Sequence, residues 1–197
     1  MQMLIYITNR KLCRDHFLDR IEQLASGKPY AIMLREKDLN EADYETLAIQ
    51  VKERCDAHQV PLLINQQIGT AAKLAIPAVH LSMENLRKYT SLLPSFQQVG
   101  ASVHSLEEAL EAQALGVHYL IAGHIFATNS KKGVPPRGLS FLEEICCHSK
   151  VPVFAIGGIT KDKVTDILLT GASGMCIMSE AMTCENPKNL ASQFRVK

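Results

Sequence analysis

The chain has 197 residues, of which 47% are hydrophobic and 21% are charged, and its formal net charge is +1. This length allows one domain with a sizeable core, and the near-neutral charge argues against a nucleic-acid-binding surface or a membrane-binding patch. No segment approaches the roughly 18 consecutive apolar residues of a membrane-spanning helix. The six cysteines form no CxxC pair. Without a secretory signal, we expect reduced thiols and a cytoplasmic protein.

Eight short apolar runs recur along the chain. They lie at 3–8, 31–35, 61–65, 78–81, 98–103, 119–125, 151–156 and 174–178. Most of them are continuous rather than alternating, which is typical of parallel strands that are buried on both faces.

Amphipathic segments separate these runs. Residues 39–58 carry an apolar stripe with helical spacing. Ser105 and Glu108 form the pattern of a capping box at the start of another helix, and Thr160 is expected to cap the next-to-last long helix. Strand and helix thus alternate eight times, which predicts a parallel sheet.

Two architectures fit this alternation. Eight units favour a single (β/α)₈ TIM barrel, α/β in class and parallel throughout, that spans 1–197 as one domain. The alternative is an open, doubly wound sheet. In a barrel, catalytic and binding residues lie at the carboxyl ends of the strands, so the residues that end each run are the candidates.

A phosphate site is predicted after the last two runs. Gly157 and Gly158 would let backbone N–H groups approach an anion before a helix begins. Met178 and Ser179 end the final run, at the place where barrel enzymes commonly bind phosphate. The alternative is that the two glycines only form a tight turn.

Two cations end the second run. Alternation along a strand points Arg35 and Lys37 to the same side, where they would suit a phosphate or carboxylate. A structural ion pair with a neighbouring carboxylate such as Glu36 or Asp38 is equally compatible with the spacing. Asn65 and Ser102 end two further runs and are further candidates for ligand binding.

The longest irregular stretch, 127–137, follows the sixth run. Its Thr128, Ser130 and Lys131 suggest a lid or an anion clamp over the barrel mouth, although a solvated charge cluster is the commoner meaning of adjacent lysines.

Among the histidines, His124 is the candidate acid/base, because imidazole exchanges protons near neutral pH and His124 ends a run that is otherwise apolar. A structural role is the alternative. His80 and His104 also lie at the ends of apolar runs, and we expect structural roles for both. No histidine spacing indicates a metal site.

Taken together, these segments resemble the thiamine phosphate synthase/TenI superfamily. The resemblance rests on 34–37, 63–65, 79–82, 102–109, 123–131, 138–139 and 155–159. It implies a (β/α)₈ barrel that acts in the thiazole and thiamine pathway.

The resemblance also separates two branches. The synthases join a pyrimidine diphosphate to a thiazole phosphate and hold Mg²⁺ with two aspartates, where this chain has Gln66 and, by the same alignment, Asn85. They also carry proline where this chain has His124. The TenI branch, whose GHxFxTxxKKG pattern matches 123–133, isomerises a carboxythiazole phosphate through that histidine.

From this resemblance we expect a thiazole tautomerase, an isomerase with His124 as its acid/base. No cofactor is expected, and Mg²⁺ would enter only for the synthase. Thiamine phosphate synthase, a transferase, is the first alternative, and a non-catalytic regulatory or ligand-binding barrel is the second. The expected partner is a small phosphorylated thiazole, with no nucleic acid and no membrane; homodimer formation is left open.

Overall fold

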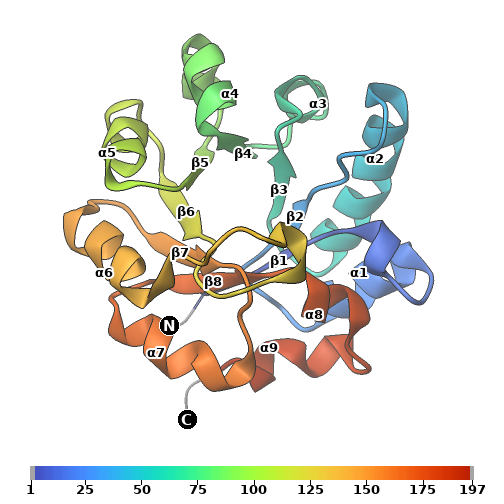
Figure 1. The fold of residues 1–197 in the computed structure, drawn as a ribbon. Coiled ribbons are helices and arrows are strands. Elements are labelled where there is room, and N and C mark those ends of the chain that lie inside the picture. Colours follow the sequence, from blue (N-terminus) through green and yellow to red (C-terminus); the bar gives the residue numbers. More distant parts are fainter. Residues whose placement is uncertain (1–2, 196–197) are drawn as a thin grey trace. The chain divides into compact units, whose positions relative to one another are not determined.

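The computed structural model describes residues 3–195. Its strands follow one another in chain order as a closed barrel. The pairs β1–β2, β2–β3, β5–β6, β6–β7 and β7–β8 are all parallel. The strands in Figure 1 are β1 (Met3–Ile7), β2 (Ala31–Leu34), β3 (Leu62–Asn65), β4 (Ala78–Ser82), β5 (Gln98–Val103), β6 (Tyr119–Gly123), β7 (Val153–Ile156) and β8 (Gly174–Ile177). The predicted eight-stranded parallel barrel is confirmed.

Helices alternate with these strands. The α-helices are α1 (Phe17–Ser26), α2 (Glu41–Ala57), α3 (Ile68–Lys73), α4 (Met83–Lys88), α5 (Leu106–Ala114), α6 (Gly138–His148), α7 (Val164–Leu169), α8 (Ser179–Thr183) and α9 (Leu190–Gln193). The 3₁₀ turns are η1 (Arg10–Leu12), η2 (Thr90–Ser95), η3 (Asn129–Lys131), η4 (Lys161–Lys163) and η5 (Pro187–Asn189). Within residues 3–195, no helix has the length and apolar character to cross a membrane.

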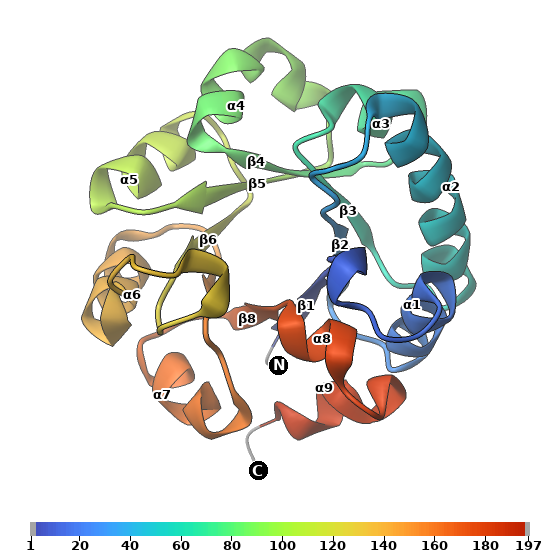
Figure 2. The ribbon, with the colours of Figure 1, turned by 45° about the vertical axis from the view of Figure 1, so that its right-hand side comes forward.

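The described chain divides into two compact units. Unit 1 comprises Met3 and His80–Cys176, and unit 2 comprises Leu4–Val79 and Ile177–Arg195. In unit 1, neighbouring helices in space are also neighbours in the chain, from α4 through α5 and α6 to α7 (Figure 2). In unit 2, α1 lies beside α2 (Figure 2). The expectation that 1–197 form a single domain stays a prediction.

The strands form the core, as their composition predicts. Every residue of β2, β3, β6 and β8 is buried. The stripe on α2 is also buried at Tyr44, Ala48, Val51 and Cys55. The continuous apolar runs therefore correctly predicted the buried strands, and the apolar stripe correctly predicted α2.

Two details at helix starts differ from the sequence prediction. Thr160 caps no long helix, because its side chain makes no capping hydrogen bond and the turn η4 precedes α7. At α5, the Ser105 hydroxyl accepts from the Glu108 N–H at 3.1 Å as expected. The Glu108 carboxylate, however, accepts from the N–H of His104 at 2.6 Å, one residue before the cap.

Candidate active site

In unit 2, the ends of β1 and β2 are joined through a buried carboxylate. Glu36 is 4% exposed. It accepts hydrogen bonds from the Thr8 hydroxyl at 2.7 Å and from the Arg10 N–H at 3.0 Å. Burial raises the pKa of Glu36, and the bonds from Thr8 and Arg10 oppose that rise. Thr8 also accepts from the Arg35 N–H at 3.0 Å, so Glu36 indirectly fixes the backbone of Arg35.

The Arg35 side chain is half-buried and takes part in no salt bridge between described residues. Burial lowers the pKa of its guanidinium. Its Nη1 lies 4.0 Å from the Met178 Sδ, so two predicted site residues meet. Asp38 pairs instead with Arg10 at 2.6 Å and with Lys11 at 3.1 Å. Glu36 interacts electrostatically with Arg35 but forms no salt bridge with it, and a desolvated cation in this situation favours a ligand anion over a structural ion pair.

The other predicted residues of unit 2 are more dispersed. β2 ends at Leu34, so strand alternation does not extend to Lys37, which is exposed. Asn65 is the last residue of β3 and is buried, with its Nδ2 3.8 Å from the Met33 Sδ. Ser179 is the exposed first residue of α8. The expectation that Arg35 and Lys37 share one strand face was therefore wrong.

In unit 1, a buried histidine orients Ser102. The His80 Nε2 lies 2.8 Å from the Ser102 Oγ, and the His80 ring stacks on Tyr119 with 5.6 Å between ring centroids. Burial lowers the pKa of His80 to about 3, so its imidazole is neutral at pH 7. This burial agrees with the structural role expected for His80, and its contact with Ser102 also fixes a predicted site residue.

His124 directly follows β6 and is 4% exposed. Its Nε2 lies 3.3 Å from the carbonyl oxygen of Val134. Because a carbonyl only accepts, this contact places a ring proton on Nε2. The Arg137 N–H donates to the His124 carbonyl at 3.0 Å, which closes the base of the loop that covers this histidine.

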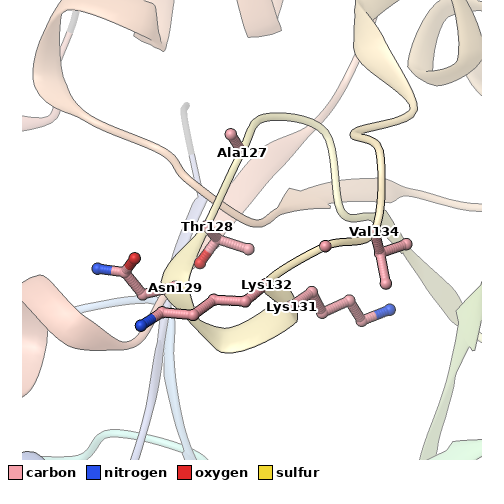
Figure 3. Close-up of a pocket in the computed structure, with 7 residues that line it drawn as sticks. Ala127, Thr128, Asn129, Lys131, Lys132 and Val134 are labelled. Atoms are coloured by element: carbon pink, nitrogen blue, oxygen red, sulfur yellow. The ribbon is translucent and has the colours of Figure 1, made fainter.

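The covering loop, residues 127–136, contains the predicted Thr128, Ser130 and Lys131 and is largely exposed. Its own residues line an open pocket of about 370 Å³. Figure 3 shows the Lys131 and Lys132 side chains extending in opposite directions from this loop. The Lys131 Nζ lies 3.3 Å from the Nε2 of His104, which attaches the loop to the end of β5.

The two glycines after β7 have positive φ angles, 100° at Gly157 and 63° at Gly158. A Cβ at Gly157 would clash with His124, and one at Gly158 would clash with the Ala127 carbonyl oxygen. Glycine is therefore required for close approach of the segment after β6, which supports the tight-turn interpretation. No turn or loop hydrogen bond between described residues uses their N–H groups, so an anion role stays a prediction.

A cation that sequence reasoning missed lies beside these glycines. The Lys163 Nζ donates to the Gly158 carbonyl at 2.8 Å and lies 4.5 Å from the centroid of the Phe126 ring. The expectation that a helix begins immediately after Gly158 was wrong, because α7 begins only at Val164. Nothing in the sequence distinguished Lys163 from an ordinary exposed lysine.

Comparison with known proteins now decides the family. The family model described as thiamine monophosphate synthase matches residues 4–181. The chain belongs to this family. The thiamine-phosphate synthase of Clostridium acetobutylicum is 31% identical, over 95% of this chain and 90% of its own length. Thiamine-phosphate synthase 2 of Streptococcus pneumoniae is 32% identical, over 98% and 94%.

A solved structure of the family agrees with this assignment. The thiamine phosphate pyrophosphorylase from Pyrococcus furiosus is 29% identical and superposes with a TM-score of 0.87, covering 98% of this chain and 93% of that one. The resemblance to the thiamine phosphate synthase/TenI superfamily is therefore confirmed.

Within this family, Gln66 and Asn85 occupy the places where the resemblance implies metal-binding aspartates. Gln66 follows β3 with a φ of 67°, and Asn85 is the third residue of α4, where its N–H donates to the Ser82 Oγ at 3.3 Å. In residues 3–195, no group of three or more His, Cys, Asp or Glu side chains could hold a metal. Neutral amide oxygens do not fit Mg²⁺ as carboxylates do.

Proposed function

We propose that this chain acts on a thiazole phosphate in thiamine biosynthesis, with formation of thiamine phosphate as the first candidate activity. The observation that carries this proposal is the 31–32% identity to proteins named thiamine-phosphate synthase over 95% or more of the chain. The names of these relatives favour the synthase over the tautomerase that the sequence led us to expect. The isomerase assignment has no support from the comparisons.

The strand ends supply groups that suit phosphorylated substrates. In unit 2, the half-buried Arg35 offers a planar, permanently charged donor for a phosphate or diphosphate. In unit 1, Ser102 is held by His80, and the N–H groups of Gly157 and Gly158 are available to an anion. In this proposal each of these groups binds and orients a phosphorylated part of a substrate, and in unit 1 the loop 127–136 excludes water from the groups of that unit.

Thiazole tautomerisation is the second candidate, and particular residues favour it. Gln66 and Asn85 replace the carboxylates that the synthases use for Mg²⁺. His124 is buried under the loop, with its Nε2 on the Val134 carbonyl oxygen. In this candidate, the other ring nitrogen removes a proton from the thiazole ring carbon and returns it to the exocyclic carbon without a metal.

Both reactions should be measured on one preparation of the purified protein. A pyrimidine diphosphate and thiazole phosphate are supplied across a range of Mg²⁺ concentrations, and a carboxythiazole phosphate is supplied separately. We expect thiamine phosphate and diphosphate to appear in equal amounts. Isomerisation without condensation would overturn the first candidate in favour of the second, and neither reaction would favour a non-catalytic barrel.

Restoring the carboxylates tests the departure from the synthase pattern. If condensation occurs, Gln66→Asp with Asn85→Asp should lower the Mg²⁺ concentration that gives half-maximal rate by roughly tenfold, because charged oxygens bind Mg²⁺ better. Aspartate tolerates the left-handed backbone at position 66. The matched control is Gln67→Asp on the adjacent residue. An unchanged Mg²⁺ dependence would show that these positions do not face the metal.

A further inference from the structure

In unit 1, three side chains form a connected chain from helix α5 to the covering loop. The Glu108 Oε2 lies 3.4 Å from the Nδ1 of His104, and the His104 Nε2 lies 3.3 Å from the Lys131 Nζ. Glu108 lies in the first turn of α5, and Lys131 lies on the covering loop. The two ring nitrogens of His104 therefore face one neighbour each.

The protonation pattern of this chain follows from the chemistry of its ends. An ammonium only donates, so the His104 Nε2 must accept, and the ring proton then sits on Nδ1 and faces the Glu108 carboxylate. Burial and the neighbouring Lys131 ammonium lower the pKa of His104, with a smaller opposing effect from Glu108; Arg137 on the loop side also lowers it. His104 is therefore the neutral Nδ1–H tautomer at pH 7.

The carboxylate end of the chain is held rigidly. The N–H of Glu108 donates to the Ser105 Oγ at 3.1 Å, and its carboxylate accepts from the His104 N–H at 2.6 Å. The same Glu108 carboxylate oxygen thus accepts from the His104 N–H and faces the imidazole Nδ1. The capping pattern of Ser105 and Glu108 is therefore connected, through His104, to Lys131 of the loop.

We propose that His104 is a positioning residue that holds the Lys131 ammonium in one place, with Glu108 fixing its tautomer, so that Lys131 meets the phosphate or diphosphate of the substrate. The anion-binding part of this role rests on the proposed function. Without the imidazole, Lys131 would be a flexible ammonium on an exposed loop and would lose conformational entropy on binding. His104 itself touches no substrate in this role.

The first test needs no ligand and no activity. In an NMR titration of the histidine rings of the whole protein, His104 should be the Nδ1–H tautomer. Lys131→Met should raise the pKa of His104, because it removes a nearby positive charge, and Glu108→Gln should lower it, because it removes a negative one. Lys132→Met is the matched control, since that side chain extends the other way (Figure 3). An unchanged pKa in Lys131→Met would overturn the proposal.

The second test uses inorganic diphosphate as the probe, with binding measured by calorimetry. His104→Ala should weaken diphosphate binding by about tenfold, as expected for the loss of one hydrogen bond to a charged group. His104→Gln, which can still accept from Lys131, should recover part of this loss. His148→Ala removes an exposed histidine of α6 and is the control.

These outcomes separate the positioning role from the enzymatic reaction. Diphosphate binding that weakens in Lys131→Met but not in His104→Ala would overturn the role of His104. A wild-type protein that binds no diphosphate would overturn the anion-binding role of Lys131. Neither result depends on whether thiamine phosphate is formed, so a failed assay of the proposed function leaves both tests decisive.

Discussion

The strand ends of the two units differ in the kind of charge that they carry. In unit 2, the residues after β1 and β2 include charged side chains, with Arg10 paired to Asp38 and the half-buried Arg35 beside Glu36. In unit 1, the last residues of β4 and β5 include a neutral imidazole and a hydroxyl, the pair of His80 and Ser102. Permanent charges suit the binding of a phosphorylated substrate, whereas neutral imidazoles suit proton exchange and the placing of other groups.

In unit 1, the largest expected effect comes from substituting His124, which tests its role in proton transfer. In the tautomerase candidate, His124→Gln should lower the rate of isomerisation by about 10²–10⁴-fold, the usual contribution of a positioned general acid/base. In the synthase candidate no proton passes through His124, and condensation should fall by less than about tenfold. Steady-state kinetics of both reactions check this, with circular dichroism as the test of folding. Isomerisation within a few-fold of wild type would remove His124 from the chemistry.

The corresponding test of unit 2 is Arg35→Met. The loss of a desolvated cation should raise the KM for the diphosphate substrate by roughly 100-fold, with a smaller change in kcat. Because Arg35 takes part in no salt bridge among the described residues, thermal unfolding should occur at the same temperature or higher.

A structural ion pair would give the opposite pattern. In that case Arg35→Met would lower the unfolding temperature and leave KM nearly unchanged. Arg87→Met is a matched control, because Arg87 is exposed and pairs with Glu111 at 2.6 Å away from the strand ends. It should leave KM as in the wild type.

The glycines after β7 provide a test of stability rather than of chemistry. Gly157→Ala should lower the free energy of unfolding by about 3 kcal/mol, because a left-handed backbone and a clash with His124 act together. Gly116→Ala has a similar φ of 86° with nothing near the new Cβ, and should cost about 1 kcal/mol. Denaturant unfolding measures both, and equal costs would mean that the segment after β6 moves aside easily.

The smallest expected effect concerns Glu36. Burial raises the pKa of Glu36, so folding favours the protonated acid. The resulting contribution to the free energy of unfolding is fully present below the ordinary pKa of 4.5. It is lost as pH rises through the higher pKa of the folded state. Glu36→Gln should remove that slope and unfold within about 4 °C of wild type at pH 7. Thermal unfolding across pH 4 to 8 checks this. An unfolding temperature that falls sharply at pH 7 would show that the ionised carboxylate stabilises the fold.

Much of the fold could be predicted because buried parallel strands need continuous apolar runs, and these are visible in the residues of β2, β3 and β6. Contacts between side chains that lie far apart in the sequence could not be predicted. The pairing of His104 with Lys131 spans 27 residues, and Lys163 reaches Gly158 across a 3₁₀ turn that replaced the expected helix start. Position at a strand end marked candidates, but only geometry separated Arg35 from the exposed Lys37.

Both candidate activities require the phosphate of a thiazole phosphate or its carboxylated form at the strand ends, and the binding of thiazole phosphate is therefore the measurement that matters most. A backbone amide NMR titration of the protein with thiazole phosphate tests it without any assumption about the reaction. We expect saturable shifts at Gly157 and Gly158, with no shift at His148 on the exposed face of α6. If no strand-end amide responds at millimolar ligand, the assignment of this chain to thiazole phosphate chemistry is wrong.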